Sequence, residues 1–129
     1  MTVISRLVLV VLAVLGVSHA AAQSRPELNL SYEQANSIWQ KDKDHADYQE
    51  YLDAFTQWNN HFKLDTRGDC YAKGKEPVTI LLVVTEHAVI EPVFSSVGGA
   101  KAECFRMSYL GLKVAKPPFS PLVIRLDMQ

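Results

Sequence analysis

An unbroken run of aliphatic and β-branched residues at 78–85 constrains the fold of this sequence most. Its composition predicts a strand. Its nearly continuous apolarity predicts a strand covered on both faces, either by parts of this chain or by the N-terminal helix on one face and a partner on the other. After a short turn, residues 89–94 predict a second strand, so that 78–94 form a β-hairpin. Pro92 lacks a backbone N–H, which places this second strand at a sheet edge or a bulge.

The chain after the hairpin provides the elements that complete a sheet. Residues 100–110 predict a helix with Ala100, Cys104 and Met107 facing inward, and Gly111 is suited to cap its end. Residues 122–128 predict a last strand. Because a two-stranded hairpin is unstable alone in water, we expect a three-stranded antiparallel sheet. With the helices on one face, this is an α+β two-layer domain of β-β-α-β order with an additional N-terminal helical segment.

Residues 31–63 form that helical segment. Ser31 and Gln34 have the spacing of a capping box. Apolar residues recur every three or four positions after it, which predicts one long helix or two, with a charged turn at 41–45 as the point of division. Residues 64–77 contain two glycines and a proline and predict a loop.

The first 22 residues have the pattern of a secretory signal peptide. Arg6 is followed by an apolar run at 7–17 and then by small residues that permit cleavage after Ala20 or after Ala22. The run is shorter than the roughly 20 residues of a membrane-spanning helix. We therefore expect an exported chain with a periplasmic or secreted location. Residues 23–129 should form a single domain, with no membrane span after cleavage.

The chain contains two cysteines, Cys70 and Cys104. In an exported chain two cysteines most often form a disulfide, because the compartment is oxidising. Two free thiols are the alternative. The spacing does not match the Cys-x-x-Cys pattern of a catalytic dithiol.

Charge and motifs argue against several classes of function. The formal net charge is −1, which gives no electrostatic support for nucleic-acid binding. His45, His61 and His87 are predicted to be exposed. The acidic residues around His45 alternate with lysines, which favours a solvated turn over a metal site. No motif of a nucleophile, a phosphate loop or a zinc protease occurs. We therefore expect no catalytic residue, metal or cofactor.

The region 70–128 resembles the C-terminal domain of TonB-type energy transducers and their small exported relatives. The resemblance rests on the strand at 78–85, on Ser95-Ser96 followed by Gly98-Gly99, and on Pro117-Pro118-Phe119 ahead of the last strand. It also includes one cysteine before the first strand and one in the helix. It implies a fold and a peptide-binding sheet edge. It does not imply energy transduction, because the long proline-rich spacer is missing.

An aromatic series at 48–62 is the richest remaining feature. It has two interpretations, packing in the core or a groove for a peptide or a glycan. The predicted binding surface consists of Tyr51, Trp58, Pro92 and Phe119. Either the second strand or the strand at 122–128 could supply an edge for strand addition.

These observations predict a non-enzymatic binding module of the cell envelope that engages a protein partner at a sheet edge. The alternative is an exported inhibitor or immunity-type protein that blocks an enzyme with a loop at 64–77 or 113–121. A small enzyme is the weakest hypothesis. The sequence identifies no partner.

Overall fold

The computed structural model describes residues 29–129, so the predicted signal peptide and both of its cleavage sites lie outside the described residues. None of the helices in the described part is long and apolar enough to cross a membrane. Along the chain the elements are α2 (Tyr32–Asp42), α3 (Ala46–Phe62), the 3-10 segment η2 (Leu64–Lys73), β1 (Val78–Val84), β2 (Ile90–Ser95), α4 (Ala100–Tyr109) and β3 (Leu122–Met128).

The three strands form an antiparallel sheet of order β2-β1-β3. Leu82 of β1 lies opposite Ile124 of β3, and Leu81 lies opposite Phe94 of β2. The pairing of β1 with β2 shifts register between Leu82 and Val84. The hairpin, the last strand and the α+β class are thus confirmed, and Pro92 lies on an irregular edge strand as its missing N–H requires.

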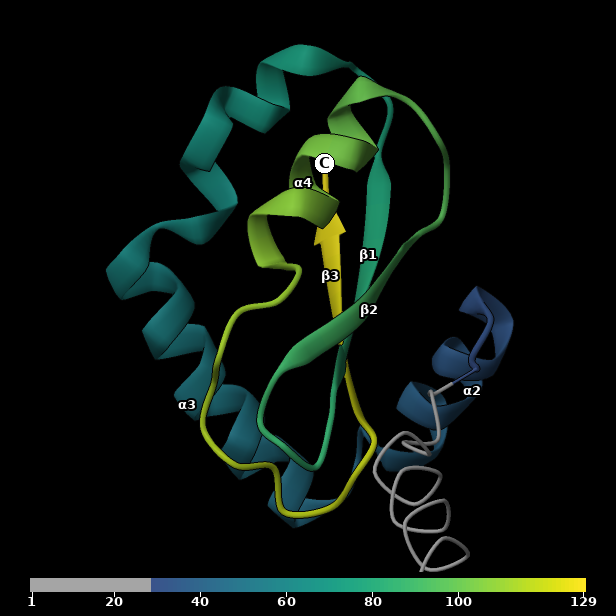
Figure 1. The fold of residues 1–129 in the computed structure, drawn as a ribbon, viewed down its shortest axis with the longest axis vertical. Helices are drawn as coiled ribbons and strands as arrows, with labels where there is room; N and C mark the ends of the chain where they lie inside the picture. The colour runs from purple at the N-terminus through teal and green to yellow at the C-terminus, as the bar shows by residue number, and fades with distance from the viewer. Residues whose placement is uncertain (1–28) are drawn as a thin grey trace, which may run out of the picture.

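The helices cover both faces of the sheet, as the nearly continuous apolarity of residues 78–85 predicted, whereas the predicted two-layer arrangement placed the helices on one face only. In Figure 1 the strands lie between α2 on one side and α3, η2 and α4 on the other. Even-numbered residues of β1 join the core beneath α3 and α4. Leu81 and Val83 form a second, smaller core with Val123 of β3 and Ala35 of α2. Helices cover both faces because the even-numbered and the odd-numbered residues of β1 are both apolar, so each face of the strand must be removed from water.

The predicted helical segment, residues 31–63, forms the two helices α2 and α3. Ser31 caps α2 with the predicted capping box. The Ser31 hydroxyl accepts a hydrogen bond from the Gln34 N–H at 3.2 Å, and the Gln34 side chain accepts one from the Ser31 N–H at 2.9 Å. The break falls at residues 43–45, within the predicted charged turn. His45 then caps α3 by accepting from the Asp47 N–H. This division allows α2 and α3 to lie on opposite faces of the sheet.

The buried face of α4 differs from the predicted one. Ala100 and Met107 are exposed and Cys104 is half-buried, whereas Lys101, Ala102, Phe105 and Tyr109 are buried. The prediction assigned the wrong face of the helix to the core, because it did not expect a lysine among the buried residues. Lys101 is 1% exposed, and its ammonium donates to the Glu76 carbonyl oxygen at 2.6 Å. This hydrogen bond is what makes the burial of a charged side chain tolerable.

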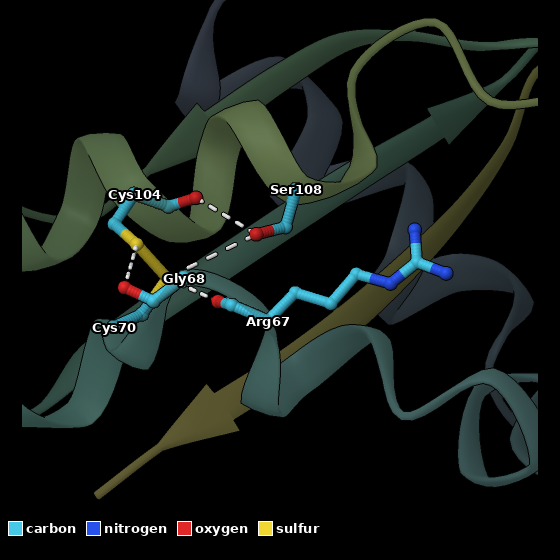
Figure 2. The surroundings of a disulfide bond; sticks show 5 residues. All are labelled: Arg67, Gly68, Cys70, Cys104 and Ser108. Carbon is cyan, nitrogen blue, oxygen red and sulfur yellow. Dashed lines mark hydrogen bonds between the residues drawn. A yellow bond between two sulfur atoms is a disulfide. The ribbon is translucent and has the colours of Figure 1, made fainter.

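Cys70 and Cys104 form a disulfide, which confirms the predicted pairing. Cys70 lies in η2, so part of the predicted loop is in fact helical. Figure 2 shows how closely the backbone approaches the bridge: the Gly68 carbonyl oxygen lies 3.7 Å from Cys104 Sγ. Gly68 has φ +70°, and a Cβ there would lie 3.4 Å from the same sulfur. Both facts favour glycine at this position.

Candidate binding surfaces

The structure brings together two of the four predicted binding residues. Tyr51 and Trp58 lie two turns apart on α3 and line the same hollow. Phe119 instead packs edge-on against the ring of His45 at the start of α3, with 5.9 Å between ring centroids. Pro92 lies on β2 and does not line the hollow. The predicted surface is therefore not a single site.

The hollow lies between α3 and the connector, residues 110–121, that joins α4 to β3. Its volume is about 80 Å³, and its walls are mostly apolar. The Tyr51 hydroxyl donates to the Ala115 carbonyl oxygen at 2.7 Å, which holds the connector against the helix. The lining residues are Tyr51, Ala54, Phe55, Trp58, Val114 and Ala115.

A wider and more open depression of about 320 Å³ continues from this hollow towards the start of α3. The two share Tyr51 and Ala54. The depression is also lined by Asp47, Glu50, Lys116 and Pro118. We call the hollow and the depression together the α3 groove.

Sequence reasoning missed most of the residues that line the α3 groove. Ala54 is the one with a visible signal, because it is a small residue on the same helical face as Tyr51 and Trp58 and leaves space between two aromatic rings. Val114, Ala115 and Lys116 carry no such signal. Their position depends on the path of the connector, which only the Tyr51 hydrogen bond and the packing of the connector establish.

Two buried tyrosines hold α3 in place and have raised pKa values. Burial raises the pKa of the Tyr48 hydroxyl to about 12, and burial raises the pKa of the Tyr51 hydroxyl to about 12. The Tyr48 hydroxyl donates to the Val123 carbonyl oxygen at 2.9 Å. Both phenols therefore remain neutral donors at neutral pH.

These pKa values predict alkaline destabilisation. Above the ordinary tyrosine pKa of about 10, the unfolded chain loses these protons while the folded chain keeps them. Their contribution to stability is thus complete below pH 10 and falls as the pH rises to about 12. Urea unfolding from pH 9 to 12 measures this decline, and the double variant Y48F/Y51F should decline less steeply. A wild-type midpoint that stays constant over this range would contradict the assignment.

The start of the outer edge of β2 is occupied by the chain that follows α4. The Ile90 N–H donates to the Leu112 carbonyl oxygen at 2.9 Å, and the Gly111 N–H donates to the Ile90 carbonyl oxygen at 2.7 Å. The Val114 N–H likewise reaches the Ala88 carbonyl oxygen. Leu81 lies opposite Phe94 and the Ser96 N–H donates to the Thr79 carbonyl oxygen, so Phe94 and Ser96 face β1 and the backbone groups of Val93 and Ser95 point outward. The bonds to residues 111–114 therefore cover the start of β2 and not its second half.

The outer edge of β3 also has outward backbone groups. The Ser96 N–H donates to the Thr79 carbonyl oxygen, so the backbone groups of odd-numbered β1 residues point towards β2 and those of even-numbered residues towards β3. The partners of the even-numbered residues are Leu122, Ile124, Leu126 and Met128. The backbone groups of Val123, Arg125 and Asp127 therefore point outward. Within residues 29–129, those of Arg125 and Asp127 have no hydrogen-bond partner.

The side chains along the β3 edge are held on the α2 face. The Arg125 guanidinium lies 4.9 Å from the centroid of the Trp39 ring and donates to Asn36 Oδ1 at 3.2 Å. Asp127 accepts from the Thr79 hydroxyl at 2.7 Å. The two side chains thus turn towards α2 while their backbone groups face outward.

Between residues 29 and 129, no group of three or more His, Cys, Asp or Glu side chains is placed to hold a metal ion. His45, His61 and His87 are exposed, as the sequence predicted. The α3 groove contains two carboxylates and one lysine but no histidine, cysteine or serine.

The chain matches no protein-family model, and no curated protein or solved structure shows significant similarity to it. The resemblance of residues 70–128 to the C-terminal domain of TonB-type transducers therefore stays a prediction.

Proposed function

We propose that this chain is an exported, non-enzymatic binding module that takes an extended segment of an envelope protein as an additional strand along the outer edge of β3. The observation that carries this proposal is the unpaired outward backbone of Arg125 and Asp127. A partner strand gains its affinity from main-chain hydrogen bonds to such groups. The resemblance to TonB-type domains agrees with this mode.

The choice of edge follows from the contrast between the two outer strands. The start of β2 already bonds to Gly111 and Leu112, and the register of its pairing with β1 shifts between Leu82 and Val84, beside Pro92. β3 is seven residues long and contains no proline. A partner strand could pair with Arg125 and Asp127, whereas the outward carbonyl oxygen of Val123 already accepts a hydrogen bond from the Tyr48 hydroxyl.

Two features support export. Residues 1–22 have the pattern of a signal peptide. The Cys70–Cys104 disulfide is typical of proteins in oxidising compartments. Both agree with a periplasmic or secreted location.

The geometry favours the binding module over an inhibitor that plugs an enzyme. Both segments that an inhibitor would use are held against the domain. The segment 64–77 is bound through the disulfide at Cys70. The segment 113–121 is held by the Tyr51 hydrogen bond and by the packing of Phe119 on His45.

Proline at position 125 tests the β3 edge. Arg125→Pro removes an outward N–H without breaking a bond within the sheet, because edge strands tolerate proline where the N–H faces solvent. Peptides selected from a random library on the wild-type domain should bind this variant roughly fivefold to tenfold more weakly, since one main-chain bond is lost and the edge is distorted. Fluorescence anisotropy measures the affinities.

The matched control is Arg125→Ala, which loses the same contacts with Trp39 and Asn36 but keeps the N–H. It should bind the selected peptides almost as well as the wild type. Hydrogen exchange adds a second readout, because bound peptide should protect the Arg125 and Asp127 amides. Equal binding by the proline and alanine variants, with no added protection at these amides, would refute strand addition at this edge.

A further inference from the structure

The α3 groove combines an apolar hollow with an acidic depression, and neither is used by the β3 edge. The hollow has a volume of about 80 Å³, roughly half that of an engineered apolar cavity of about 150 Å³ that binds benzene. Its size suits an aliphatic side chain better than an aromatic ring. Trp58 and Phe55 provide apolar walls for such a side chain.

The depression is suited to a positive charge. Asp47 and Glu50 line it on the α3 side, and Lys116 is the single basic residue on its wall. Within the described residues Glu50 takes part in no ion pair, and Asp47 has only a 4.0 Å contact with His45. A basic side chain seated here would complement the excess of carboxylates.

The distance between the hollow and the depression limits how far apart the two recognised side chains of a peptide ligand can lie. The α3 positions that line the hollow (51, 54, 55 and 58) are centred four residues further along the helix than those that line the depression (47, 50, 51 and 54), a rise of about 6 Å. In an extended chain, side chains on the same face are two residues apart, or about 6.6–6.8 Å. One extended peptide can therefore place an apolar side chain in the hollow and a basic side chain in the depression.

We propose that the α3 groove binds an extended segment of a partner protein in which an aliphatic residue and a lysine or arginine are separated by one residue. This is a second interaction surface, independent of strand addition at β3. A glycan fits the groove less well, because the hollow is mostly apolar and the Tyr51 hydroxyl already donates to Ala115. A sugar would leave its own hydroxyls unpaired there.

Capped pentapeptides test this proposal by NMR titration of the isotope-labelled domain, residues 23–129. The two probes are Gly-Leu-Ser-Lys-Gly and Gly-Lys-Ser-Leu-Gly, which differ in chain direction. At least one should shift the amide signals of residues lining the groove. Replacing its leucine by glycine should weaken binding roughly tenfold or more, the factor that burial of a Leu side chain confers. Replacing its lysine by glutamate should abolish the shifts.

Two variants of the domain locate the binding. Ala54 is exposed and lines both parts, so Ala54→Leu fills the hollow from within a helix that tolerates leucine, and should weaken binding roughly tenfold. Glu50→Gln should weaken binding about threefold at low salt, as expected for an exposed ion pair. The matched control is Asp53→Asn, an exposed carboxylate of the same helix that does not line the groove, and it should leave the affinity unchanged.

Arg125→Pro should also leave this binding unchanged, which separates the groove from the β3 edge. The proposal is overturned if neither probe shifts the groove signals, if the leucine-to-glycine peptide binds equally well, or if Glu50→Gln and Asp53→Asn behave alike. Shifts confined to the β3 edge would also overturn it, while supporting the other surface.

Discussion

Replacing Cys70 and Cys104 together by alanine is expected to lower the free energy of unfolding by about 3–4 kcal/mol. The disulfide joins residues that are 34 positions apart. In the chain-entropy model, opening a loop of this length returns that much conformational freedom to the unfolded chain. The loss corresponds to a decrease in Tm of roughly 12–30 °C for a domain of this size. Thermal unfolding followed by circular dichroism measures it.

The reducing agent is the control for the disulfide prediction. Dithiothreitol should lower the Tm of the wild type towards that of the double variant and leave the variant unchanged. The structure also predicts where the loss appears, because the bridge joins η2 to α4. Amide exchange should accelerate first in η2. A variant that unfolds within 1 °C of the oxidised wild type would show that the loop entropy is offset elsewhere.

Phe105→Ala is expected to cost about 3–5 kcal/mol, the usual range for removing a buried phenylalanine. Phe105 has no exposed surface and contacts the Tyr71 ring edge-on, with 4.9 Å between centroids. Its ring joins α4 to the core beneath β1, so the alanine variant leaves a cavity that the sheet cannot fill. Urea unfolding measures the loss.

Met107→Ala is the matched control on the same helix. Met107 is 58% exposed, so its replacement should change stability by no more than about 0.5 kcal/mol. The pair of variants also tests the orientation of α4, since the sequence pattern placed Met107 inward. A large loss for Met107→Ala with a small loss for Phe105→Ala would show that the helix is turned the other way.

The strands were predictable because their evidence is local. The run at 78–85 has no competing interpretation, and its observed counterpart, β1, spans Val78–Val84. Pro92 placed its strand at an edge through one missing donor. The capping box at Ser31 was equally local, since it involves groups three residues apart.

The face of α4 was not predictable by the same means. Its sequence offers two overlapping apolar stripes, and the one actually buried includes Lys101. That lysine is accommodated by the Glu76 carbonyl oxygen, which lies 25 residues away in the chain. The pattern of apolar residues within the helix cannot predict a hydrogen bond to a residue so far away in the sequence.

The candidate surfaces show the same division. Tyr51 and Trp58 came together because both lie on one helical face, a relation that spacing alone reveals. Phe119 and Pro92 were grouped with them by residue type, and the structure separates them. The sequence did not predict the path of the connector. This path creates the α3 groove and also covers the start of β2.

From local composition and spacing alone, this chain specifies three strands, their antiparallel sheet, the capping box at Ser31 and the cysteine pair that an oxidising compartment would join. The tertiary structure decides which face each helix covers, which backbone groups of the outer strands stay unpaired and where α3 meets the connector. The physical reason is the sequence separation over which each kind of interaction acts. Propensity, capping and alternation act over a few residues, whereas the burial of Lys101, the Tyr51–Ala115 hydrogen bond and the open edge of β3 depend on segments that meet only after the chain has folded.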